Sequence, residues 1–148
     1  MIFTVGALAL ADPVSFAATS IGVDLGYQAL SVRADLKPDT FIQVDFGSTG
    51  YGYGYGHLNG FSIGADYCKI YPRKKDSTFE PDIFYGFGAE VISLGSFTLL
   101  AGRIPFGLNW RIKNTPLEVG VAAVPYLVFG DRSFSALGIS IPFRWVIE

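Results

Sequence analysis

The chain has 148 residues, which is enough for one domain, and its composition is unusually apolar. Hydrophobic residues make up 50% of it and charged residues only 16%, whereas soluble domains carry about 25% charged residues. The formal net charge of −2 gives no support for a nucleic-acid partner, and the single Cys68 excludes an internal disulfide. The low charge therefore favours a membrane environment.

The N-terminal segment is apolar but too short to cross a membrane as a helix, which needs about 20 residues. The longest apolar run is Met1–Ala11, and it ends in Ala9-Leu10-Ala11, an A-x-A pattern before Asp12. We expect residues 1–11 to be the remnant of a signal peptide and residues 12–148 to form one domain. A disordered or strand-like N-terminus is the alternative, because no basic segment precedes the apolar run.

Apolar residues alternate with small or polar ones along most of the remaining chain. A period of two is typical of β-strands whose faces meet two different environments. The expected strands are Ser20–Tyr27, Ala29–Leu36, Ile42–Phe46, Phe61–Cys68, Asp82–Val91, Phe97–Ile112, Leu117–Phe129 and Ala136–Ile147. Short turn sequences separate most of them and no helical period intervenes, so we predict about eight antiparallel strands. Residues 20–36 could also form one bulged strand, but we favour a hairpin.

The charged residues of these strands fall on one face. They are Asp24, Arg33, Asp35, Asp45, Asp66, Glu90, Arg103, Arg111, Glu118 and Arg144. Only Lys69 lies on the apolar face, near a strand end. A soluble lipocalin-like barrel would place the apolar face inside and the charged face in water. The charged face is instead rich in Gly, Ala and Ser, which suits a crowded interior. We therefore predict an all-β fold, an eight-stranded antiparallel up-and-down transmembrane β-barrel whose apolar face meets lipid.

Aromatic residues lie near many of the strand ends, where a membrane barrel carries interfacial girdles. They are Tyr27, Phe41, Tyr71, Phe97, Trp110, Phe129 and Trp145. In the segment Phe97–Ile112, we expect Ile104, Phe106, Leu108 and Trp110 to face lipid. Arg103, Asn109 and Arg111 should face inward, within reach of Glu90 and Glu118 on neighbouring strands.

The strand pattern, together with Gly102–Trp110 and the following Asn114–Glu118, resembles the small eight-stranded outer-membrane barrels of the OmpA/OmpX/OmpW-like group. This resemblance implies a monomer in the bacterial outer membrane, in contact with lipopolysaccharide or lipid headgroups. It implies a structural, surface-interaction or adhesive role and no catalytic residue. A narrow OmpW-like conduit for small apolar solutes is the alternative.

The ten strand charges should form an interior ion-pair network, because an eight-stranded barrel is just wide enough for side chains. We expect no enzyme, no cofactor and no metal site, since no Cys/His cluster is present. A lipid A-modifying enzyme is the less favoured third hypothesis. The lone His57 is followed by Leu58, not by the His-x-Ser of the deacylases, and only loop residues such as Asp131 and Ser133 could join it.

The segment 48–60 contains Tyr51, Tyr53, Tyr55 and His57, with Gly between the tyrosines. Aromatic rings on a flexible backbone can stack on sugars or on a protein surface. We therefore treat these four residues as a candidate binding surface for an extracellular protein or glycan. An ordinary loop, or tyrosines at the mouth of the barrel, is the alternative interpretation.

Overall fold

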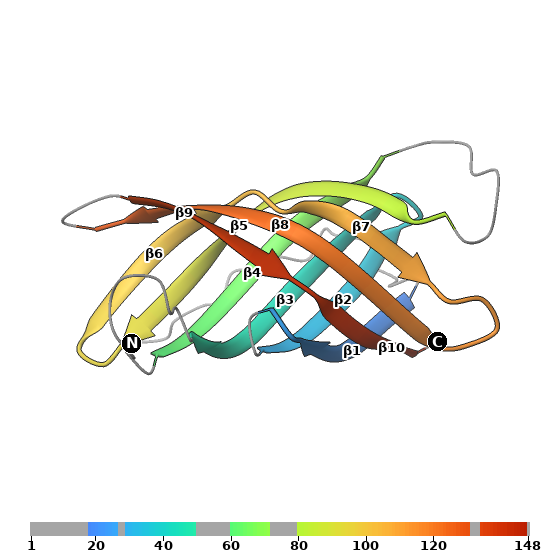
Figure 1. Cartoon of the computed structure of the whole chain (residues 1–148), viewed down its shortest axis with the longest axis horizontal. Coiled ribbons are helices and arrows are strands. Elements are labelled where there is room, and N and C mark those ends of the chain that lie inside the picture. The colour runs from blue at the N-terminus through green and yellow to red at the C-terminus, as the bar shows by residue number, and fades with distance from the viewer. Residues whose placement is uncertain (1–17, 27–28, 50–59, 72–79, 131–133, 148) are drawn as a thin grey trace, which may run out of the picture.

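The computed structural model describes residues 18–26, 29–49, 60–71, 80–130 and 134–147, all in strands or in the turns between them. The strands are β1 (Ala18–Asp24), β2 (Ala29–Lys37), β3 (Thr40–Thr49), β4 (Gly60–Ile70), β5 (Asp82–Leu94), β6 (Phe97–Arg103), β7 (Phe106–Arg111), β8 (Leu117–Phe129), β9 (Phe134–Ser140) and β10 (Pro142–Ile147). Every pairing between them is antiparallel, and all belong to one sheet. The predicted all-β, antiparallel class is therefore confirmed (Figure 1).

The sheet closes on itself into a ring that passes through eight strands. Strands β1 to β6 pair in sequence, β6 pairs with β8, and β10 pairs with both β8 and β1. Strands β6 and β7 share one register against β5 and β8, and the break between them is at Ile104 and Pro105. Strands β9 and β10 likewise share one register against β8, with the break before Pro142. Proline lacks the N–H that a ladder needs, so these four segments form two continuous strands.

The first hairpin settles the choice between one bulged strand and two strands over residues 20–36. β1 pairs antiparallel with β2 over its whole length, from Ala18 opposite Asp35 to Asp24 opposite Ala29. The favoured hairpin is thus confirmed. Each strand could be predicted separately because each carries its own period of two.

The stagger of the ring follows from its register. Starting at Ser20, successive partners around the ring are Arg33, Gln43, Asp66, Gly88, Arg103, Tyr126 and Ala136. In the other direction Ser20 pairs directly with Val146, which lies ten residues beyond Ala136 on the same continuous strand. With about 3.3 Å of rise per residue and about 4.8 Å between strands, this stagger tilts the strands by about 40°.

The two faces of the closed sheet have opposite chemistry. Large apolar side chains such as Phe87, Leu137 and Trp145 point outward and are more than half exposed. Charged side chains are buried on the inner face, and Arg103 is only 2% exposed. A lipocalin-like barrel would require the reverse arrangement. Ile104 and Phe106 are exposed on the outer face, whereas Leu108 and Trp110 are partly buried.

The interior also contains apolar side chains, and one of them corrects the sequence-based assignment. Phe41 was expected in an outer aromatic girdle, but it is 1% exposed and packs edge-on against Phe84, with the ring centroids 5.4 Å apart. Its position has the same parity as Gln43 and Asp45, so alternation directs its side chain inward. Tyr71, Phe97, Phe129 and Trp145 are exposed on the outer face, and Tyr27 lies outside the described residues.

Candidate functional site

The first of two interior charge clusters is centred on Arg103, in the last position of β6. Its guanidinium lies 2.9 Å from Asp66, 3.2 Å from Asp45 and 3.7 Å from Glu90. These carboxylates come from β4, β3 and β5, so one cation connects four strands. All four side chains are at most 6% exposed. We call these residues the Arg103 cluster.

Two small residues and a polar one shape this cluster. A Cβ atom at Gly64 would overlap the Arg103 Nη1 atom, and one at Gly88 would overlap Asp66 Oδ1. Glycine at both positions therefore gives the side chains of the cluster room to meet. Gln43 donates from its amide to both carboxylate oxygens of Asp45, at 3.2 and 3.0 Å, which fixes the orientation of that acid.

The second cluster has the opposite design, with a carboxylate at its centre. Glu118 near the start of β8 accepts ion pairs from Arg144 at 2.9 Å, Arg33 at 3.3 Å and Arg111 at 3.4 Å. Asp35 shares two of these cations, at 2.8 Å from Arg33 and 3.2 Å from Arg111. We call these five residues the Glu118 cluster. It joins β2, β7, β8 and β10.

Neutral groups complete the Glu118 cluster. Ser20 on β1 donates to Glu118 at 3.5 Å, and Arg144 donates to the Ser31 hydroxyl at 3.0 Å. The Arg33 guanidinium lies 3.9 Å from the centroid of the Phe41 ring, a cation–π contact. The aromatic side chain that alternation turns inward thus packs against one of the buried cations.

Asp24 lies apart from both clusters. Its carboxylate accepts hydrogen bonds from the Ser140 hydroxyl, from the Ile141 backbone N–H at 2.8 Å and from the Gly26 backbone N–H at 2.9 Å. These contacts connect the end of β1 to the break between β9 and β10. Asp24 was expected in the interior charge network; these hydrogen bonds hold it to backbone and hydroxyl donors, at a distance from the two clusters.

The clusters occupy different heights in the ring. Glu118 follows the turn between β7 and β8, and Arg144 lies near the end of β10, so the Glu118 cluster is at the end of the ring where the C-terminus lies (Figure 1). Asp66 and Glu90 are in the middle of β4 and β5, so the Arg103 cluster lies deeper. Arg111 ends β7, and its side chain is 46% exposed at the rim.

Nine of the ten predicted interior charges belong to one of the two clusters, and Asp24 does not. Sequence reasoning did not include the polar partners Ser20, Ser31, Gln43 and Ser140. Their signal was available, because each lies on the charged parity of its strand. The candidate surface residues Tyr51, Tyr53, Tyr55 and His57 lie outside the described residues, as do Asp131, Ser133 and residues 1–11.

This arrangement can hold strands together through buried charge-assisted contacts. The described residues contain no group of three or more His, Cys, Asp or Glu side chains placed to hold a metal ion. In the same part of the chain, no helix is long and apolar enough to cross a membrane. Comparison of the sequence with protein-family models and with curated proteins, and of the structure with solved structures, gave no match.

Proposed function

We propose that the chain is an integral outer-membrane β-barrel with a charged, largely filled interior and a structural, surface-interaction or adhesive role. The observation that carries the proposal is the inverted distribution of side chains, with charges inside the ring and large apolar residues outside. A soluble monomer rarely exposes apolar patches larger than a few hundred Å². Here the apolar face extends over every strand of the ring, which suits hydrocarbon as the surrounding solvent.

The dimensions of the ring support the same conclusion. β8 has thirteen residues, and at a tilt of about 40° it rises about 30 Å, close to the thickness of a bilayer core. A tilt of about 40° also lies within the range of membrane barrels. Ring closure pairs each of the eight strands on the closed path with two neighbours, which matters in lipid because no water can satisfy an open edge; β9, off this path, pairs only with β8 among the described strands.

The filled interior favours a structural role over conduction. Arg103, Glu118, Arg144 and Tyr126 project into the ring and are each at most 3% exposed. A ring of eight strands leaves space for side chains and little more. We therefore expect no conductance in planar bilayers. Stable single-channel steps that disappear in Arg103→Ala would support the narrow conduit instead.

The membrane proposal is tested by placing a charge on the outer face. Ile139, in β9, is 58% exposed and lies far from both ends of the continuous β9–β10 strand. In a bilayer, Ile139→Arg should lower the unfolding free energy by about 2–4 kcal/mol. The control is Ile147→Arg, at the end of the same strand, where the expected loss is about 0–1 kcal/mol.

The chain is refolded into phospholipid vesicles and unfolded with urea. The folded fraction at each urea concentration is read from heat-modifiable gel mobility, that is, from the band that shifts when the sample is heated. Equal and small effects of the two arginines would contradict a bilayer around the outer face. A chain that folds as a stable monomer in water without detergent would overturn the proposal outright.

A further inference from the structure

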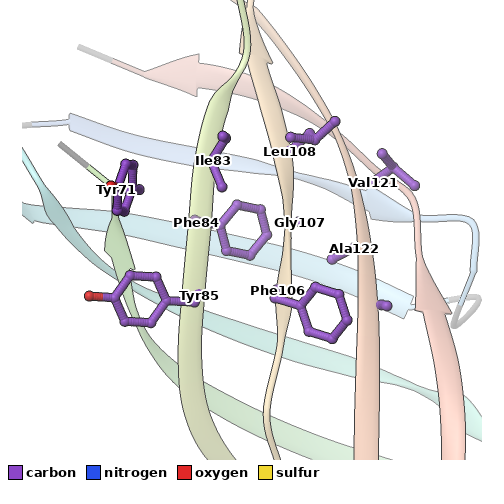
Figure 2. Close-up of a pocket in the computed structure, with 10 residues that line it drawn as sticks. Tyr71, Ile83, Phe84, Tyr85, Phe106, Gly107, Leu108, Val121 and Ala122 are labelled. Carbon is purple, nitrogen blue, oxygen red and sulfur yellow. The ribbon is translucent and has the colours of Figure 1, made fainter. Parts of the chain in front are cut away.

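The outer face has an apolar groove near the end of the ring where β7 ends (Figure 2). It has a volume of about 410 Å³ and lies over β5, β7 and β8. Tyr85 and Phe106 project on either side of it, and Tyr71 lies at its edge in the close-up. Small-ligand sites have volumes of about 300–1,000 Å³, so the groove is large enough for a ligand.

The register explains why the surface is hollow at this place. Phe106 pairs with Tyr85 on one side and with Ala123 on the other, so two large rings stand beside a single methyl group. Gly107 pairs with Ala122, and a Cβ atom at Gly107 would overlap the Val121 carbonyl oxygen. Gly107 and Ala122 have the inward parity of their strands, so the floor of the groove is the backbone of β7 and β8, and Ala123 is the small outward residue beside the larger rings.

A single cation lies beside this groove. Lys69 on β4 is directly opposite Tyr85 and two residues from Tyr71 on the same face. Apart from Lys37, which ends β2, it is the only charged residue at an outward position of the described strands. Lys69 forms no ion pair with any described residue. In a bilayer, the ammonium group of Lys69 needs an anion from outside the chain. That anion must lie at a depth that the flexible lysine side chain can reach.

We propose that the groove binds an acyl chain of an anionic glycerophospholipid whose phosphate pairs with Lys69. The inference rests on the proposed membrane location and adds a specific ligand to it. The groove supplies the apolar contacts and Lys69 supplies the charge, within one strand spacing of each other. A second copy of the chain fits less well, because the outward positions of the described strands offer no acid to Lys69.

The test is native mass spectrometry of the detergent-purified chain titrated with phosphatidylglycerol or phosphatidylcholine. The wild type should retain one phosphatidylglycerol and bind it about fivefold more tightly than phosphatidylcholine, because the choline cation of phosphatidylcholine offsets the phosphate charge that attracts Lys69. Lys69→Gln should abolish this preference, and Lys69→Glu should reverse it. Lys113→Gln, the same change at an exposed turn lysine, is the matched control and should bind like the wild type.

A second pair of variants tests the groove. Ala123→Phe should fill it and remove the binding of both lipids, whereas Ala65→Phe, on the outer face of β4 and outside the groove, should leave binding unchanged.

Every variant is first checked for the heat-modifiable folded band in vesicles. If none folds there, the membrane proposal fails. If they fold but the wild type shows no lipid preference, or Ala123→Phe binds like the wild type, the lipid site fails. A lipid-free dimer would also overturn it in favour of a second copy.

Discussion

The two interior clusters are near mirror images of each other in charge. In the Arg103 cluster one cation meets three carboxylates, and in the Glu118 cluster one carboxylate meets three arginines. With all groups ionised, the first cluster has a net charge of −2, and the second, counting Asp35, has +1. Each cluster therefore has one central residue that contacts three groups of the opposite charge.

The clusters also divide the ring between them. Arg103 connects β6 to β3, β4 and β5, and Glu118 connects β8 to β2, β7 and β10. The hydrogen bond between Asp24 and Ser140 adds β1 and β9. Several of these contacts join strands that are not neighbours, such as Arg103 with Asp45 on β3. Interior charges thus constrain the cross-section of the ring in a way that the backbone ladder, which joins only neighbours, does not.

The largest effect is expected from Arg103→Met. It removes the central cation and leaves Asp45, Asp66 and Glu90 buried together without it, which should lower the unfolding free energy by about 3–5 kcal/mol. Urea unfolding in vesicles measures the loss. Adding Asp66→Asn and Glu90→Gln to Arg103→Met removes the uncompensated charge and should recover part of the stability. No recovery would mean that packing of the long side chain, and not charge, is what Arg103 supplies.

A smaller but still large effect is expected from Glu118→Gln. The amide keeps the shape of the side chain and can still accept hydrogen bonds, but Arg33 and Arg144 lose the carboxylate that they share. Asp35 is then the only carboxylate left in the cluster. We expect a loss of about 3 kcal/mol in the same unfolding assay. The Glu118 cluster lies closer to the end of the ring, so we expect it to contribute less to stability than the Arg103 cluster. A larger loss for Glu118→Gln than for Arg103→Met would contradict this expectation.

Gly64→Ala tests whether space, as well as charge, defines the Arg103 cluster. The new methyl group would overlap the Arg103 guanidinium, so the side chain must shift away from its acids, at a cost of about 1–3 kcal/mol. Gly102→Ala is the matched control, because its Cβ would meet only Phe129, at 3.7 Å. The cost of Gly64→Ala should largely vanish in an Arg103→Met background. A cost that persists there would place its origin in the backbone of β4.

The sequence predicted the strands and their faces better than the contacts inside the ring. Alternation is local, so each strand revealed its own inward positions, and even Phe41 follows the parity of Gln43 and Asp45 despite its assignment to a girdle. Partner choice is not local. Whether Arg103 meets Asp45 or Asp35 depends on the ten-residue stagger of the closed sheet, which accumulates over all eight strands. For the same reason, no strand pattern could show that Arg111 reaches the rim while Arg33 stays buried.

Arg111 and Arg33 provide the finest test of the comparison, because both pair with Glu118 and Asp35. The Arg111 side chain is 46% exposed and that of Arg33 is 5% exposed. Water and salt screen an exposed ion pair, so Arg111→Gln should cost less than about 1 kcal/mol, and less still at high ionic strength. Arg33→Gln removes a buried cation that also contacts Phe41, and its larger cost should change little with salt. The measurement is the unfolding free energy of both variants at low and at 1 M salt. An equal salt dependence would indicate that water reaches both arginines, and the Glu118 cluster would then be an open vestibule and not part of the closed interior.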